Sequence, residues 1–157
     1  MIRFVEFPSC PIPDLVSYRE EMYSNLGWPV SSWESIDHSS RIYIAEDNSG
    51  VIVGTIRVTV FDSLVVLSRL ISSSSHVFLN LISSSISDLG DDVNCVVVEV
   101  SEESSEMYSR LGLDVAIGPF FTDRYGANDV LLVGEVGNDR FINFMEKIRG
   151  HFGVFHE

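Results

Sequence analysis

The chain has very little lysine and little positive charge of any kind. Lys147 is its only lysine, and 10 lysine and arginine residues stand against 23 aspartate and glutamate residues in 157 positions, for a net charge of −13. A protein with so few cations is poorly suited to bind polyanions. We therefore expect neither nucleic acid nor an anionic membrane surface as a partner.

Long apolar runs and paired cysteines are also missing. No run approaches the roughly 18 residues of a membrane span, and the N-terminus shows no basic segment followed by an apolar one. Cys10 and Cys95 are far apart and have no metal-ligand spacing. The four histidines do not cluster either: they are His38, His76, His151 and His156. We expect free thiols, no signal peptide, no metal site and a cytoplasmic location.

What is present indicates a folded globule. The hydrophobic content is 45% and the mean hydropathy is +0.20. A chain of this length can bury a core of ordinary size, and no linker or repeat interrupts it. We predict a single α/β domain over residues 1–157, with the element order β-α-(α)-β-β-β-α-β-α-β.

The first half is predicted to contain a strand, a helix and a meander. Asp14 is expected to cap the helix, and Gly27 is placed to end it in a left-handed conformation. Gly50 lies in turn chemistry typical of a hairpin. The expected elements are a strand over Met1–Phe7, a helix from Asp14 to about Asn25, and antiparallel strands over Arg41–Ala45, Val51–Val60 and Leu64–Ile71.

The second half predicts a helix, a buried strand, a short helix and two further strands. Ser101 offers an N-cap for the short helix, and Gly112 is placed to end it. A last helix over Asp139–Phe152 carries an aromatic stripe that would pack on the sheet or on another subunit of a homodimer. The expected ranges of the others are His76–Leu89, Val93–Val100, Leu113–Ile117 and Val130–Val136.

The segment Tyr108-Ser-Arg-Leu-Gly112-Leu113 resembles the Tyr-x-x-Leu-Gly-Phe signature of the GNAT acyltransferases. This resemblance implies a mixed, mostly antiparallel central sheet flanked by helices. It also implies that Tyr108 protonates the departing thiolate of an acyl thioester. The alternative is a half-buried aromatic that anchors its helix to the sheet.

A second, ordered set of motifs is similar to the acyl-homoserine-lactone (autoinducer) synthases, which have a GNAT-like fold. The N-acyl amino acid synthases are an equally good comparison. The matching residues are Arg19, Tyr23 and Trp28 in the opening segment, the acidic pair Glu34 and Asp37, Arg57, and Ser68-Arg69-Leu70. The resemblance implies that Arg19, Tyr23, Trp28 and Arg57 bind the substrate.

The GNAT resemblance also places the acyl donor. It implies that the pantetheine arm lies beside Leu67, Ser68, Arg69 and Leu70, on a strand that splays from the strand of Cys95. Most coenzyme A enzymes follow with a glycine-rich loop, but this chain has Ser72, Ser73, Ser74 and Ser75. These serines could hold a phosphate with their hydroxyls and the helix-start amides, or they could cap and solvate the turn.

Aminolysis of a thioester needs a neutral amine, an oxyanion donor and a proton for the leaving thiolate. Glu34 and Asp37 could recognise or deprotonate a cationic amine, or they could cap a helix. Arg57 and Arg69 could bind a carboxylate or phosphate, or they could be exposed or ion-paired. Glu99, on an apolar strand, would be a general base with a raised pKa if buried, or it could face solvent.

We therefore expect an N-acyltransferase that moves an acyl group from a thioester to the amine of a small molecule. The donor would be acyl-coenzyme A, acetyl-coenzyme A or an acyl carrier protein, and the last is acidic and would need a local basic patch. One alternative is an acetyl-coenzyme A-dependent N-acetyltransferase. The other is a GNAT-shaped binding or regulatory protein, favoured by the missing glycines and by Val66, where the autoinducer synthases carry glutamate.

Overall fold

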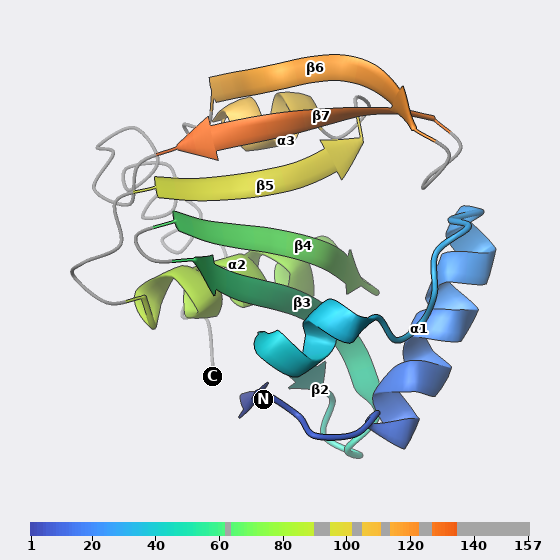
Figure 1. Cartoon of the computed structure of the whole chain (residues 1–157). Helices are drawn as coiled ribbons and strands as arrows, with labels where there is room; N and C mark the ends of the chain where they lie inside the picture. The colour runs from blue at the N-terminus through green and yellow to red at the C-terminus, as the bar shows by residue number, and fades with distance from the viewer. Residues whose placement is uncertain (62–63, 90–94, 102–104, 111–113, 123–126, 135–157) are drawn as a thin grey trace.

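A computed structural model describes residues 1–61, 64–89, 95–101, 105–110, 114–122 and 127–134 (Figure 1). In chain order the elements are β1 (Ile2–Glu6), α1 (Pro13–Leu26), the 3-10 helix η1 (Ser35–Ser39), β2 (Arg41–Glu46), β3 (Ile52–Phe61), β4 (Leu64–Ser72), α2 (Ser75–Ser87), β5 (Cys95–Ser101), α3 (Ser105–Arg110), β6 (Asp114–Thr122) and β7 (Ala127–Gly134). This is the predicted order followed by β7, which corresponds to the further strand expected over Val130–Val136. The expected helix over Asp139–Phe152, the turn at Asp62–Ser63 and the glycines Gly90 and Gly112 lie outside the described residues.

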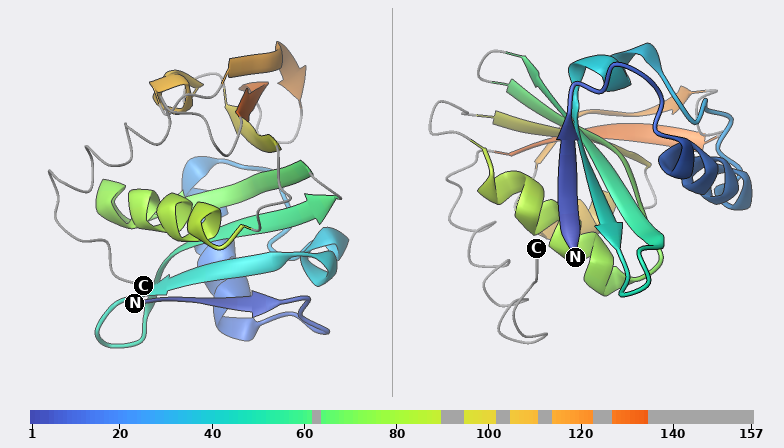
Figure 2. Two further views of the ribbon diagram at one scale, coloured as in Figure 1. Left: turned by 90° about the vertical axis from the view of Figure 1, so that its left-hand side faces the viewer. Right: turned by 90° about the horizontal axis from the view of Figure 1, so that it is seen from below.

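In the described residues the strands form one seven-stranded sheet in the order β1-β2-β3-β4-β5-β7-β6. Every neighbouring pair is antiparallel except β4 and β5, which run parallel. Helix α1 and η1 lie on one face and α2 lies on the other (Figure 2). The predicted mixed, mostly antiparallel sheet flanked by helices is therefore confirmed.

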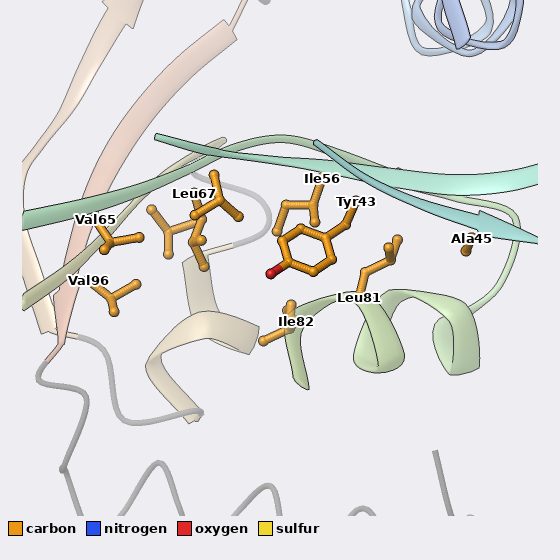
Figure 3. Packing of buried hydrophobic residues seen from close by; sticks show 10 residues of the cluster. Tyr43, Ala45, Ile56, Val65, Leu67, Leu81, Ile82 and Val96 are labelled. Atoms are coloured by element: carbon orange, nitrogen blue, oxygen red, sulfur yellow. The ribbon is translucent and has the colours of Figure 1, made fainter. Parts of the chain in front are cut away.

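The main core fills the space between α2 and the sheet. Leu81 and Ile82 of α2 pack against Tyr43, Ile56 and other buried side chains of the central strands (Figure 3). Gly54 of β3 allows a close approach, because a Cβ atom there would meet Cγ1 of Val77 at 2.6 Å. Helix α2 is thus fixed directly against the centre of the sheet.

A second, smaller core lies under α1. Leu15 is fully buried there against Ile42, Ile44 and Ile52. The expected cap at Asp14 is wrong: the N-cap is Ile12, which makes no side-chain cap bond, and Pro13 occupies the first turn, where its missing N–H is not needed. Similarly, Ser101 is the last residue of β5 rather than the N-cap of α3.

The end of α1 follows the prediction. Gly27 has a φ of +70°, and its left-handed conformation turns the chain so that the backbone N–H of Trp28 donates to the carbonyl of Tyr23 over 2.9 Å. The Tyr23 and Trp28 rings consequently lie 5.6 Å apart between centroids. This turn starts the segment that carries Trp33 and Glu34 back across the sheet.

Strands β4 and β5 separate along their length. Their register pairs Leu64 with Cys95 and ends at Leu67 with Val98, although β4 continues to Ser72 and β5 to Ser101. The two strands are therefore adjacent but diverging, as predicted. α2 begins immediately after the free end of β4, so its N-terminus lies at the open end of this fork (Figure 1).

Candidate active site

Five of the residues selected from the sequence meet in one ion-pair network on the face that carries α1 and η1. Oε1 of Glu34 lies 3.0 Å from Nη1 of Arg57 and 2.8 Å from Nε of Arg69. Oδ1 of Asp37 lies 3.2 Å from Nη1 of Arg19 and 3.4 Å from Nη1 of Arg57. Residues from α1, η1, β3, β4 and a loop are joined in this way, and we call this set the charge cluster.

Strand alternation brings Arg57 to the charge cluster. Ile56 and Val58 join the core under α2, so Arg57 between them points to the opposite face. Its Nε donates to Oγ of Ser68 on the neighbouring strand over 3.0 Å. The sequence left Arg57 either exposed or ion-paired. It is only 4% exposed, so the ion-paired alternative is the one observed.

A β-bulge brings Arg69 to the same face as Ser68. The register between β3 and β4 shifts between Thr55 and Arg57, and Arg69 has a φ of +54°. Successive residues of a regular strand point to opposite faces, so this bulge is what lets both side chains reach the charge cluster. A positive φ in a residue with a Cβ is strained and is typical of functional sites.

Glu34 and Asp37 also cap η1. Glu34 is the N-cap residue, and its backbone N–H donates to Oδ2 of Asp37 over 2.8 Å, while the Glu34 side chain accepts in return from the backbone N–H of Asp37. This is a capping box. Helix capping, one of the roles expected for this pair, is therefore observed, and recognition or deprotonation of a cationic amine stays a prediction.

The surrounding arginines determine the charge of Glu34. Burial alone would raise its pKa, but the hydrogen bond and charge of Arg69, together with those of Arg57, hold the pKa below its ordinary value of 4.5. Asp37 is fully buried and both of its oxygens accept hydrogen bonds. A carboxylate with a lowered pKa is a weak base, so this environment does not favour deprotonation of an amine by Glu34.

Aromatic side chains surround the charge cluster. Tyr23 is 3% exposed, and burial raises the pKa of its phenol, although the charges of Arg19, Arg69 and Arg57 partly offset this. The ring of Trp33 lies 5.6 Å from the guanidinium carbon of Arg19. These rings shield the ion pairs from water, which strengthens their interaction.

Trp33 and His38 were not selected as site residues from the sequence. Nε1 of Trp33 donates to Nε2 of His38 over 3.2 Å, while Nδ1 of His38 lies 2.7 Å from the carbonyl of Pro8. The tautomer with its proton on Nδ1 satisfies both contacts. Trp33 directly precedes Glu34 in the acidic motif, and this adjacency is the sequence feature that could have identified it as a site residue.

At the expected donor site, the serines make local contacts. Oγ of Ser74 accepts from the backbone N–H of Val77 over 3.2 Å and caps α2, and Oγ of Ser72 donates to the carbonyl of Ser74 over 2.9 Å. Capping is thus the observed role of Ser74. Ser73 and Ser75 are exposed beside the start of α2, and phosphate binding there remains a prediction.

The other expected site residues occupy the fork between β4 and β5. Leu67 is buried and Leu70 is half-buried against the core under α2, while Ser68 and Arg69 reach the charge cluster. Glu99 follows Val98, the last residue of β5 that pairs with β4. Tyr108 lies in α3, beside β7. The side chains of Glu99 and Tyr108 lie outside the described part, so their roles remain predictions.

The described residues offer neither a metal centre nor a membrane-spanning helix. None of their histidine, cysteine, aspartate and glutamate side chains form a group of three or more that could hold a metal ion. Within the same ranges, no helix has the length and apolar character needed to cross a membrane. Cys10 is an exposed free thiol.

Comparison of the sequence with protein-family models and with curated proteins gave no match. Comparison with solved structures gave many. TofI aligns with a TM-score of 0.74 and 13% identity over 93% of this chain and 96% of its own. An acyl-CoA N-acyltransferase from Pseudomonas aeruginosa aligns at 0.69 and 15% over 85% and 98%. A GNAT-family acetyltransferase from Staphylococcus aureus Mu50 aligns at 0.66 and 13% over 87% and 99%. The chain therefore has the GNAT fold.

Proposed function

We propose that this protein is an N-acyltransferase that moves an acyl group from a thioester to the amine of a small molecule, in the manner of the autoinducer synthases. The observation that carries this proposal is the charge cluster at the fork of β4 and β5. Five side chains far apart in sequence converge there, and each belongs to a motif of that resemblance.

The charge cluster supports an acceptor site on the face of α1. Glu34 keeps 26% of its side chain exposed while its partners Arg57 and Arg69 are almost completely buried. An approaching ammonium would meet an ionised carboxylate held in a fixed position. Similarity in fold to TofI, which has been solved in a ternary complex with an inhibitor and MTA, agrees with a small-molecule acceptor.

The fork supports a thioester donor site. Beyond Leu67, strand β4 has no partner on β5 in the described part, which leaves room for the extended pantetheine arm to approach its backbone. In the reaction the neutral amine nitrogen attacks the thioester carbonyl and the C–S bond breaks. The thiolate takes a proton and the nitrogen of the new amide loses one, which restores the acid. We assign the proton that the thiolate takes to Tyr108 of α3, the helix that follows β5 in the chain.

An acetyl-coenzyme A-dependent N-acetyltransferase is the second candidate. It is favoured by the similarity in fold to the acetyltransferase from Staphylococcus aureus. The capped serine turn argues for a different donor, because Ser74 and Ser72 use their hydroxyls locally and no glycine opens the start of α2.

A thermal-shift panel separates the candidates. Acetyl-coenzyme A, octanoyl-coenzyme A and octanoyl-loaded acyl carrier protein would each be added to the purified protein, with free coenzyme A as the control. We expect the octanoyl donors to raise the melting temperature more than acetyl-coenzyme A does. A shift with acetyl-coenzyme A alone would favour the second candidate, and no shift with any donor would favour a non-catalytic binding protein.

A further inference from the structure

Strand β1 is an edge strand that carries exposed apolar side chains. In the described part of the chain it pairs only with β2, and Figure 2 shows it, in dark blue, at the border of the sheet. Phe4 of β1 is 47% exposed, and the residues on either side of the strand, Met1 and Phe7, are 73% and 63% exposed. An apolar strand edge with unpaired backbone groups is a ready template for pairing with another chain.

The register with β2 determines which backbone groups of β1 face outward. Met1 exchanges two backbone hydrogen bonds with Glu46, each over 2.9 Å. Along an antiparallel pair, residues whose N–H and C=O face the partner strand alternate with residues whose groups face away from it. The odd-numbered residues of this segment therefore bond to β2. The residues that turn their N–H and C=O to the open edge are Ile2, Phe4 and Glu6.

The charged side chains of β1 are paired within the chain. Nε of Arg3 lies 2.6 Å from Oε1 of Glu46, and Glu6 forms an ion pair with Arg41. Many edge strands carry lysine, whose charge discourages pairing with another strand, and β1 has none. Because each charge of β1 is balanced by an opposite charge of β2, the charges on this strand do not block the approach of a second strand.

The sequence of β1 is complementary to itself when two copies run antiparallel about Phe4. A twofold axis through this residue sets Phe4 opposite Phe4 and Ile2 opposite Glu6. All outward N–H and C=O groups of β1 then find partners in the other copy. The same register brings Met1 of each copy beside Phe7 of the other, so the exposed apolar side chains meet one another.

Neighbouring registers are less favourable. A shift by one residue would turn the side chains of the two copies to opposite faces, so the axis moves in steps that keep the faces matched. An axis through Arg3 would set two arginines directly opposite, which is destabilising. An axis through Val5 would set Ile2 opposite Pro8, which has no N–H to donate.

We propose that β1 is a homodimer interface, at which two copies of this chain pair their β1 strands antiparallel about Phe4 and join their sheets. The same surface is used on both copies, so the contact closes at two subunits and does not propagate. The interface shares no residue with the charge cluster, and the inference is therefore independent of the proposed function.

Sedimentation velocity of the full chain tests the proposal. We expect the wild type to be a dimer at micromolar concentration, and Phe4→Lys, which sets two like charges opposite each other, to have half that mass. Leu26→Lys is the matched control: it adds the same charge at another exposed hydrophobic side chain, at the end of α1, and should stay dimeric. A monomeric wild type, or a dimeric Phe4→Lys, would overturn the inference.

Disulfide cross-linking tests the register and decides the case if Phe4→Lys does not fold. Cys10→Ser first removes the exposed thiol, and Phe4→Cys or Glu6→Cys is then added. In the proposed dimer the two Cα atoms at position 4 lie about 5.5 Å apart, within disulfide range, whereas those at position 6 lie about 14 Å apart. Mild oxidation should yield a covalent dimer with Phe4→Cys and none with Glu6→Cys. Equal cross-linking of both variants, or of neither, would contradict the proposed pairing.

Discussion

Ser68 and Arg69 are consecutive residues of β4, yet both reach the same face of the sheet, where Ser68 bonds to Arg57 and Arg69 to Glu34. The bulge at Arg69, with its φ of +54°, makes this possible. The bulge brings Arg69 to Glu34 while Ser68 stays bonded to Arg57, so the backbone at this point is part of the site.

This bulge predicts an unusual order of stability for two variants of Arg69. Both Arg69→Ala and Arg69→Gly lose the bonds to Glu34, but only glycine adopts the positive φ without a steric penalty. The Gly variant should therefore be more stable than the Ala variant by about 1 kcal/mol, the reverse of the usual order in a strand. Urea denaturation measures the difference. An Ala variant that is the more stable of the two would show that the bulge is lost with the side chain.

Among single substitutions in the charge cluster, removal of the Asp37 side chain should lower the unfolding free energy most. Its loss leaves Arg19 and Arg57 buried with one partner fewer each, and breaking a buried pair of this kind typically costs about 3–5 kcal/mol. We expect that loss of unfolding free energy for Asp37→Ala and a smaller one for Asp37→Asn, which keeps an acceptor for the Glu34 backbone. Chemical denaturation measures both.

The control for Asp37 is Glu106→Gln. Glu106 pairs with Arg110 one turn along α3, and both side chains are largely exposed. An exposed pair of this kind contributes little, so the variant should unfold close to the wild type. Equal losses at Asp37 and Glu106 would mean that the buried network adds nothing beyond a surface ion pair.

Glu34 should make the unfolding free energy depend on pH. Its pKa in the folded protein lies below the ordinary 4.5, so its contribution is complete above that pH and is lost as the pH falls through the lower folded value. The unfolding free energy of the wild type should exceed that of Glu34→Gln at pH 7, and the gap should narrow steadily below pH 4.5. A gap that stays constant with pH would contradict an ionised, ion-paired Glu34.

Gly54 should be intolerant of a side chain because it fixes α2 against the sheet. A methyl group there would meet Val77 and Leu81 below 3.0 Å, so Gly54→Ala should cost about 1–3 kcal/mol by overpacking. Gly50→Asn is the control, since that turn has open space and asparagine tolerates a positive φ. Thermal melting of both variants measures the contrast. Equal melting temperatures would mean that α2 moves away without cost.

The sequence predicted the elements well because their signals are local. Gly27 ended α1 and Gly50 turned the hairpin as expected, each with a positive φ. Asp14 failed as a cap because an acidic residue suits both the cap and the first turn, and Pro13 fixed the boundary one residue earlier. The order of the motifs also predicted Arg19, Glu34 and Arg69 as site residues.

The sequence could not predict how the site residues pair. Whether Arg57 and Arg69 were exposed or ion-paired depends on strand register and on a bulge, which are set by contacts across the sheet. Arg19 likewise has buried Nε and Nη2 atoms without a hydrogen-bond partner, and this is visible only when the positions of Asp37 and Ser32 are known. Trp33 is adjacent to Glu34 in the sequence, but its contact with Arg19 depends on how α1 packs against residues 28–34.

The most direct test of the account is acyl transfer by the wild-type protein and by Tyr108→Phe. Purified protein would be incubated with octanoyl-coenzyme A or octanoyl-loaded acyl carrier protein and an equimolar amino acid mixture, and N-octanoyl products would be measured by mass spectrometry alongside released thiol. We predict N-acyl product from the wild type and a rate about 10²–10⁴-fold lower for Tyr108→Phe, with unchanged melting temperature and donor affinity. A wild-type protein that binds a donor but forms no N-acyl product would contradict the central claim, and wild-type turnover by Tyr108→Phe would remove the tyrosine from the mechanism.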